Sequence, residues 1–162
     1  MRHLENVATQ ALEAFRKMVL DISDILPMSH WENLLYIIAF THDFGKATSF
    51  FQNYIRANVE KQKKLRNDPR THHGLLSAVY AYWVSAQYLQ QKITGWDDSV
   101  VPFLPFFAFL IVKKHHGDLD NAVPDEMYSG QFDYLKEQIN HVEYEELKTL
   151  MNILGNYLGC LL

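Results

Sequence analysis

The stretch THDFGKATSFFQ, residues 41–52, decides how the rest of the chain is interpreted. It places a histidine directly before an aspartate, continues with Gly-Lys, and follows an apolar run of the kind that buries one face of a helix. A capping-box spacing, Ser-x-x-Glu at residues 29–32, precedes that run. We therefore predict a helix over residues 31–42 that ends near Gly45, with the His42-Asp43 pair at its last turn.

Helical spacing recurs along the rest of the chain, and the alternating pattern of strands is almost absent. Near the N-terminus, residues at steps of three and four form the stripe of an amphipathic helix. This stripe consists of His3, Val7, Ala11, Ala14 and Met18. Further helices are predicted over residues 73–91, 106–114, 129–140 and 143–159. The sequence thus predicts an all-α fold, a compact single-domain helical bundle.

Two of these helices carry predictions about burial. Residues 106–114 are apolar nearly all round, so we expect a central buried helix that Gly117 ends. In the helix over residues 73–91, the side chains expected to face inward are Leu76, Val79, Tyr80 and Trp83. Residues 97–105 and 117–124 are expected to be irregular.

The composition is that of a folded domain. The 162 residues are 48% apolar and 14% aromatic, enough to bury a core. The single cysteine, Cys160, excludes an internal disulfide and fits a reducing compartment, so a cytoplasmic location is expected. Residues 100–112 form the longest apolar stretch, which is too short and too interrupted by prolines to cross a bilayer, so no membrane partner is expected.

The charge is unevenly distributed. The net charge is −4, yet residues 56–70 carry +4 and the remainder therefore −8. The basic side chains of this segment are Arg56, Lys61, Lys63, Lys64, Arg66 and Arg70. A basic segment on an acidic body can bind a phosphate backbone, and a solvated helix face is the alternative interpretation.

Six of the eight histidines fall into four groups at helix ends or on an apolar stripe. These groups are His3, His42 beside Asp43, the pair His72-His73, and the pair His115-His116. Imidazole nitrogens with a carboxylate are suitable ligands for divalent transition metals, and helix ends can direct them toward one point in a bundle. The other two, His30 and His141, are interpreted as surface residues.

The order H…HD…H…HH resembles the HD superfamily of metal-dependent phosphohydrolases. More narrowly, THDFGKATSFFQ, then HHGLLSA, then KKHHGD are similar to the HD nuclease domain of the CRISPR-associated type I helicase-nuclease. The motifs cover His3 to Asp118, and we expect residues 1–162 to form one HD nuclease domain. The resemblance implies hydrolysis of single-stranded DNA, and it leaves endonuclease and exonuclease action open.

The resemblance also implies a set of metal ligands for two ions. One ion would be held by His3, His42 and Asp43, and Asp43 would bridge to the second. The second would also be held by His73, His115 and His116, with His72 as the reserve for His73. Histidine-rich ligation favours Mn, Ni, Co or Fe over Mg.

Lys46 matches the lysine of the family, and the resemblance implies that it contacts the scissile phosphate or steadies Asp43. Gly45 is expected to leave room for the backbone and the phosphate to approach. Together the ions would activate a water and hold the attacking and leaving oxygens. The catalytic residues implied are thus Asp43 and Lys46.

Single-stranded DNA suits a surface that combines aromatic and basic side chains. Phe50, Phe51 and Tyr54 follow the HD motif, and the basic segment follows them; Phe51 or Tyr54 could instead face inward. The nucleic-acid contacts expected are Arg56, Lys61, Lys63, Lys64 and Arg66. The family implies two partners besides DNA, a CRISPR-associated helicase and an RNA-guided surveillance complex.

One expected ligand is missing. The superfamily usually supplies a last aspartate from a later helix, but no acid follows Glu146 here, and Asp118 and Asp120 lie too close to His116 in sequence. The apolar ending, residues 153–162, predicts that the native domain continues and supplies this acid.

Two other functions remain open at this point. An HD phosphohydrolase of nucleotides or cyclic dinucleotides would share the H…HD pattern, although the HHG cluster argues against it. A non-catalytic module that recruits a helicase would not need so many retained ligand candidates.

Overall fold

The computed structural model describes residues 2–93, 100–115, 129–160 and 162. Within them the chain forms eight α-helices and no strand, which confirms the all-α prediction. The helices are α1 (Arg2–Phe15), α2 (Met28–Thr41), α3 (Ser49–Arg56), α4 (Val59–Leu65), α5 (Gly74–Lys92), α6 (Leu104–Lys114), α7 (Ser129–Asn140) and α8 (Tyr144–Leu158). Three short 3₁₀ turns, η1 (Phe44–Ala47), η2 (Pro69–Thr71) and η3 (Val101–Phe103), connect or precede them.

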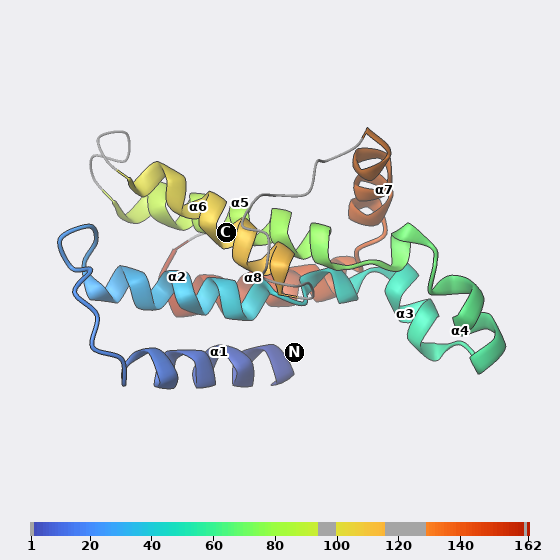
Figure 1. The fold of residues 1–162 in the computed structure, drawn as a ribbon, viewed down its shortest axis with the longest axis horizontal. Helices are drawn as coiled ribbons and strands as arrows, with labels where there is room; N and C mark the ends of the chain where they lie inside the picture. The colour runs from blue at the N-terminus through green and yellow to red at the C-terminus, as the bar shows by residue number, and fades with distance from the viewer. Residues whose placement is uncertain (1, 94–99, 116–128, 161) are drawn as a thin grey trace.

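The long helices lie side by side and alternate in direction. Figure 1 shows α1 beneath α2, with α5 and α6 above α2, and contacts join α1 to α2, α2 to α5, and α5 to α6. The start of α1, the end of α2, the start of α5 and the end of α6 therefore meet at the middle of the molecule. Helices α3 and α4 extend away from this point toward one end (Figure 1).

The core lies between α2, α5 and α8, with α1 packed against it. Its largest fully buried side chains include Ile37, Phe40, Tyr88 and Leu154. The loop after η1 is tied to the start of α8, because Ser49 N donates to His141 O at 2.9 Å. An isolated antiparallel bridge between Thr48 and Val142 reinforces that link. This link brings the first turns of α8 close to the residues that follow the HD motif.

The predictions for the first two helices need correction. Helix α1 ends before Met18, and Ala14 and Met18 are exposed, because the row that packs inward is centred on Ala8 and Leu12. The capping box does not form either. Helix α2 already begins at Met28, and its Glu32 carboxylate instead pairs with the guanidinium of Arg16 at 2.6 Å.

The prediction of a central buried helix over residues 106–114 is wrong. Helix α6 packs one face on α5 but leaves Phe106, Phe107 and Ile111 about half exposed, at 45%, 51% and 55%. An all-round apolar sequence does not fix which face turns inward. Its expected end at Gly117 lies outside the described residues.

In α5, Leu76 and Tyr80 are buried as expected, whereas Val79 is only partly buried and Trp83 is exposed at 39%.

Among the described residues, no helix combines the length and the apolar character needed to cross a membrane.

Candidate metal centre

Asp43 is the centre of the site. It follows the end of α2, is 6% exposed, and uses its two carboxylate oxygens differently. Oδ2 lies 3.1 Å from Nε2 of His42 and 2.7 Å from Nζ of Lys46, whereas Oδ1 lies 3.2 Å from Nε2 of His73. One buried carboxylate therefore contacts side chains from both sides.

These contacts also set the charge of Asp43. Burial by itself raises the pKa of a carboxyl group, because it disfavours the charged form. Hydrogen bonds from His42, His73 and Lys46 outweigh burial and hold the pKa of Asp43 far below its usual range. The carboxylate is therefore ionised throughout the physiological pH range and available as a ligand.

His42 is oriented by the backbone. Its Nδ1 lies 2.7 Å from the carbonyl oxygen of Ala39, which can only accept, so Nδ1 carries a proton and neutral His42 has its lone pair on Nε2. That lone pair then faces Asp43 Oδ2 at 3.1 Å, and two acceptors at this distance need a positive charge between them. The hydrogen bond to Asp43 outweighs burial and raises the pKa of His42 above its ordinary value.

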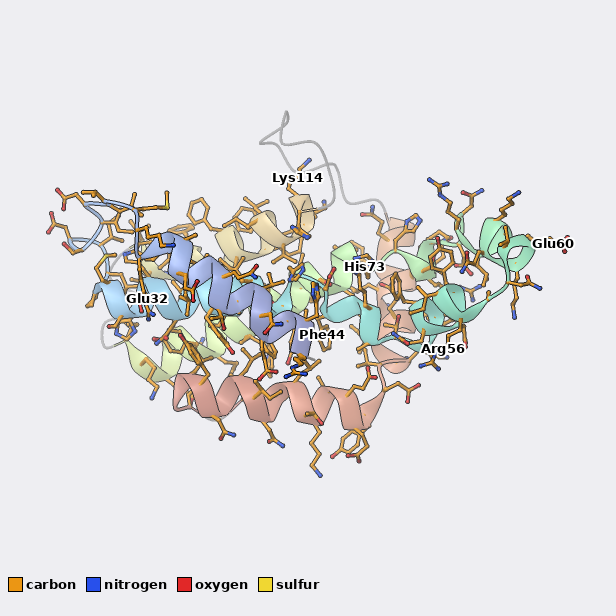
Figure 2. The ribbon with its side chains drawn as sticks, turned by 90° about the horizontal axis from the view of Figure 1, so that it is seen from below. Glu32, Phe44, Arg56, Glu60, His73 and Lys114 are labelled. Atoms are coloured by element: carbon orange, nitrogen blue, oxygen red, sulfur yellow. The ribbon has the colours of Figure 1, made fainter. Side chains whose placement is uncertain are left out.

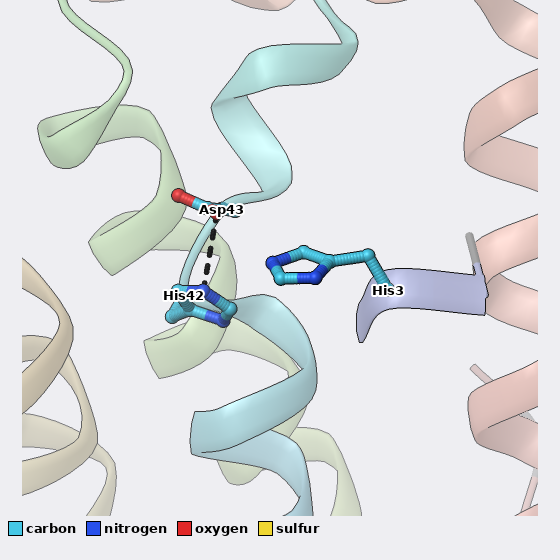
Figure 3. Close-up of side chains that lie close together, drawn as sticks. All are labelled: His3, His42 and Asp43. Carbon is cyan, nitrogen blue, oxygen red and sulfur yellow. Dashed lines mark ion pairs between the residues drawn. The ribbon is translucent and has the colours of Figure 1, made fainter. Parts of the chain in front are cut away.

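His3 reaches the pair from a separate helix. In Figure 3 its ring extends from the first turn of α1 toward His42 and Asp43. One ligand atom from each of the three residues lies within 4.8 Å of the others, a spacing that can hold a metal ion. The donor set, two imidazoles and a carboxylate with a backbone carbonyl fixing one tautomer, fits a divalent transition metal.

The other predicted histidines are placed differently from one another. His73 contacts Asp43, whereas the exposed His72 turns its Nε2 toward the carbonyl of Arg66 at 3.2 Å. His115 lies at the end of α6, and the centroid of its ring is 4.7 Å from the centroid of the His42 ring. His116 lies outside the described residues.

Gly45 leaves room for a backbone to approach, as expected, and this backbone is the start of α5. Gly45 lies in the 3₁₀ turn η1 and does not have the positive φ of a helix cap. A Cβ on Gly45 would lie only 2.4 Å from the backbone oxygen of His73, and its own N–H donates to Ser77 Oγ at 2.9 Å. The glycine thus brings the HD turn against the start of α5.

The histidines interpreted as surface residues fall into two cases. His141 is exposed, as expected, and its ring lies 4.4 Å from that of Phe50. His30 is half-buried, with Nδ1 2.6 Å from the hydroxyl of Tyr88, so for His30 that interpretation was wrong. Neither residue contacts Asp43 among the contacts described.

Two depressions flank Asp43. One is a cavity of about 230 Å³ whose lining includes His3, Asp43, Lys46, Gln52, Glu146 and Leu150. The other is a groove of about 650 Å³ whose lining includes Phe51, Tyr54, Arg66, His72, His73 and Lys113. Of the basic residues predicted to bind nucleic acid, Arg66 lines this groove, whereas Arg56, Lys61, Lys63 and Lys64 do not.

The family model described as Cas3, HD domain matches residues 1–158. The chain belongs to the Cas3 HD-domain family. Comparisons with curated proteins and with solved structures returned no match. Membership in the Cas3 HD-domain family identifies a CRISPR-associated domain of the nuclease, and hence hydrolase, type.

Sequence reasoning missed several residues that shape this Cas3-type centre. Gln138 on α7 is buried, and its Nε2 donates to the carbonyls of Arg70 and His72 at 2.9 and 2.8 Å, which fixes the backbone ahead of His73. Gln52 similarly donates to the carbonyl of Lys46 at 2.9 Å. Glu146 places a second carboxylate in the lining of the cavity that contains His3.

Proposed function

We propose that this chain is a metal-dependent nuclease that cleaves single-stranded DNA in CRISPR antiviral defence. The observation that supports it best is the position of Asp43. Its two oxygens lie 3.1 and 3.2 Å from the Nε2 atoms of His42 and His73, which belong to different segments. A carboxylate in this position can be shared by two cations, as two-metal phosphodiesterases require.

The proposed ligands divide into two sets that share Asp43. His3 and His42 would hold one ion with it, and His73, His115 and His116 would hold the other. The C-terminal ends of α2 and α6, at His42 and His115, add partial negative charge that favours cations. We expect Mn, Ni, Co or Fe rather than Mg, because imidazole nitrogens dominate both sets.

When bound, such ions supply a water of lowered pKa and hold the oxygens of an in-line displacement at phosphorus. Lys46 keeps Asp43 oriented through its 2.7 Å contact, and its side chain is 38% exposed. This exposure leaves its ammonium group able to approach a substrate phosphate as well. His73 links Asp43 to the groove, where the DNA strand enters.

Glu146 is the residue we propose for the carboxylate that the sequence pattern left unassigned. The support is its place in the lining of the cavity beside His3 and Asp43. Glu146→Gln should weaken Mn binding by about tenfold or more in calorimetric titration, because it removes a negatively charged ligand. Glu145→Gln is the matched control, since Glu145 is exposed on α8, as Glu146 is, but does not line the cavity. Equal affinities for the two variants would remove Glu146 from the site.

The proposed partners are a helicase and an RNA-guided surveillance complex. Besides the family, the exposed apolar side chains of Phe106, Phe107 and Ile111 support a protein partner, because apolar surface gathered on one helix face often marks a contact site.

The function is tested with protein stripped of metal by a chelator. Cleavage of a single-stranded oligodeoxynucleotide should appear only after Mn is added, and Asp43→Asn should lower it by at least about a hundredfold while retaining the helical circular dichroism. His141→Ala is the control, since His141 is exposed and outside the centre. Metal-independent cleavage, or full activity of Asp43→Asn, would refute the two-metal nuclease. Faster hydrolysis of cyclic dinucleotides than of DNA would instead favour the phosphohydrolase alternative.

A further inference from the structure

The groove beside the candidate centre is continuous with it. His73 lines the groove, and its Nε2 lies 3.2 Å from Asp43 Oδ1. The wall of the groove therefore includes a side chain in direct contact with Asp43. The cavity on the other side, at about 230 Å³, is smaller than typical ligand pockets, whereas the 650 Å³ groove falls within their range. The groove, rather than the cavity, has room for nucleotides.

Aromatic rings lead along the groove toward Asp43. The ring of Phe51 contacts the ring of His73 edge-on, with 5.0 Å between the ring centroids. The centroid of the Tyr54 ring lies 6.0 Å from that of Phe51. Both Phe51 and Tyr54 are partly exposed and line the groove. Phe50 is not available for stacking with bases, because its ring packs on that of His141 and lies under the guanidinium of Arg70. The guanidinium carbon is 5.1 Å from the ring centroid. Unpaired bases can stack on such rings, whereas the base faces of a duplex are hidden.

The charge of the groove suits phosphate. Arg66 from the end of α4 and Lys113 from the last turn of α6 both line it. No carboxylate occurs among the described residues of its lining, whereas Glu146 lines the cavity. Two cationic side chains from separate helices favour a polyanion over a neutral ligand.

The lysines of α4 occupy a different place. Figure 2 shows Glu60, in the first turn of α4, at the end of the molecule and well away from His73. Only at its C-terminal end does α4 return to the groove, where the carbonyl of Arg66 meets Nε2 of His72 at 3.2 Å. Lys61, Lys63 and Lys64 are exposed and outside the groove lining.

We propose that this groove binds the segment of single-stranded DNA next to the scissile phosphate. Bases stack on Phe51 and Tyr54, and phosphates contact Arg66 and Lys113. The lysines of α4 contact only DNA farther along the strand. This inference rests on the proposed nuclease function, but it concerns binding and is tested without metal.

The test compares short and long strands by fluorescence anisotropy in the presence of a chelator. The probes are labelled oligothymidylates of about 4 and about 20 nucleotides, since binding modules of this kind cover about 4–16 nucleotides. The groove variants are Tyr54→Leu and the double change Arg66→Ala with Lys113→Ala. Phe51 is left intact because its ring contacts His73. The comparison variant is Lys61→Ala, Lys63→Ala and Lys64→Ala together, and circular dichroism verifies the fold of each.

The groove variants should weaken binding of both strands, by about tenfold or more for Tyr54→Leu. The double variant should lower the slope of log K against log salt by about 1.4, or 0.7 for each lost phosphate contact. The α4 variant should leave the short strand unchanged and weaken only the long one.

Unchanged binding of the short strand by the groove variants would overturn the inference, as would an equal loss in the α4 variant. So would failure of the wild-type protein to bind either strand. Mn-dependent hydrolysis of a nitrophenyl phosphodiester is measured in parallel and reports on the proposed chemistry separately. Groove binding without any hydrolysis would refute the nuclease and retain the groove.

Discussion

Gly45 has no room for a side chain. A Cβ there would lie 2.4 Å from the backbone oxygen of His73 and 2.9 Å from its Cα. We predict that Gly45→Ala pushes the start of α5 away from Asp43 and destabilises the fold by about 1–3 kcal/mol, the usual cost of overpacking. Urea unfolding and Mn titration should both register the change.

Gly74 provides the matched control for this prediction. It is the first residue of α5, only one position beyond His73, yet a Cβ on it meets nothing within 4 Å. Gly74→Ala should keep the metal affinity and leave stability unchanged or raised by up to about 1 kcal/mol, because the unfolded chain loses freedom. Similar losses in both variants would contradict the steric argument.

His30 makes stability depend on pH. Burial and the nearby charge of Lys92 lower its pKa in the folded state below the ordinary value of about 6.5. As the pH falls through 6.5, the unfolded chain therefore takes up a proton that the folded protein resists, and stability falls. Protonation would also oblige Nδ1 to donate toward Tyr88, whose hydroxyl already accepts from Asn33 at 2.7 Å.

We predict that His30→Gln loses stability less steeply than wild type between about pH 7.5 and pH 5.5, because the titrating group is gone. The measurement is the urea midpoint at both values. His141→Gln, at an exposed position, should retain the wild-type slope. A parallel pH dependence in His30→Gln and wild type would show that His30 is not responsible.

Helix α7 supports the centre through one side chain. Gln138 is 2% exposed and donates to the carbonyls of Arg70 and His72 through partly buried hydrogen bonds, so its loss removes the donor that these acceptors share. We predict that Gln138→Leu costs about 1–3 kcal/mol of stability and also weakens Mn binding, because the segment that carries His73 loosens. Gln10→Leu, at an exposed position on α1, should do neither. A stability loss with unchanged Mn affinity would confine Gln138 to a structural role.

The elements differ in how far the sequence could predict them. Helices α7 and α8 were expected over 129–140 and 143–159, and they span Ser129–Asn140 and Tyr144–Leu158. Their amphipathic spacing is local information. The buried face of α6 could not be predicted locally, because a helix that is apolar nearly all round has no polar side to mark which face turns outward. Only its packing on α5 selects the buried face.

The same distinction applies to the candidate site. The grouping of His3, His42 and Asp43 could be anticipated, because the motif names the residues and the helix ends direct them together. Gln138 and Ser77 could not, since their partners lie 66 and 32 residues away and only the tertiary fold brings them into contact. Lys113 in the groove was missed for the same reason.

At the scale of the whole molecule, metal should stabilise the fold. Ligands drawn from separate helices meet only in the folded state, so an ion that binds there shifts the folding equilibrium. At a free Mn concentration about a hundredfold above its Kd, the gain should be about 2.7 kcal/mol. Thermal midpoints with and without chelator measure this gain, and Asp43→Ala should abolish it. An identical midpoint in both conditions would exclude a metal site formed by folding.

Because neighbouring helices alternate in direction, the proposed ligands come from distant parts of the sequence and are synthesised at different times. His3 is made first, His42 and Asp43 follow, and His115 emerges only after α6 has been synthesised. A nascent chain or proteolytic fragment that stops before α6 therefore lacks part of the proposed ligand set, however well its first helices have formed.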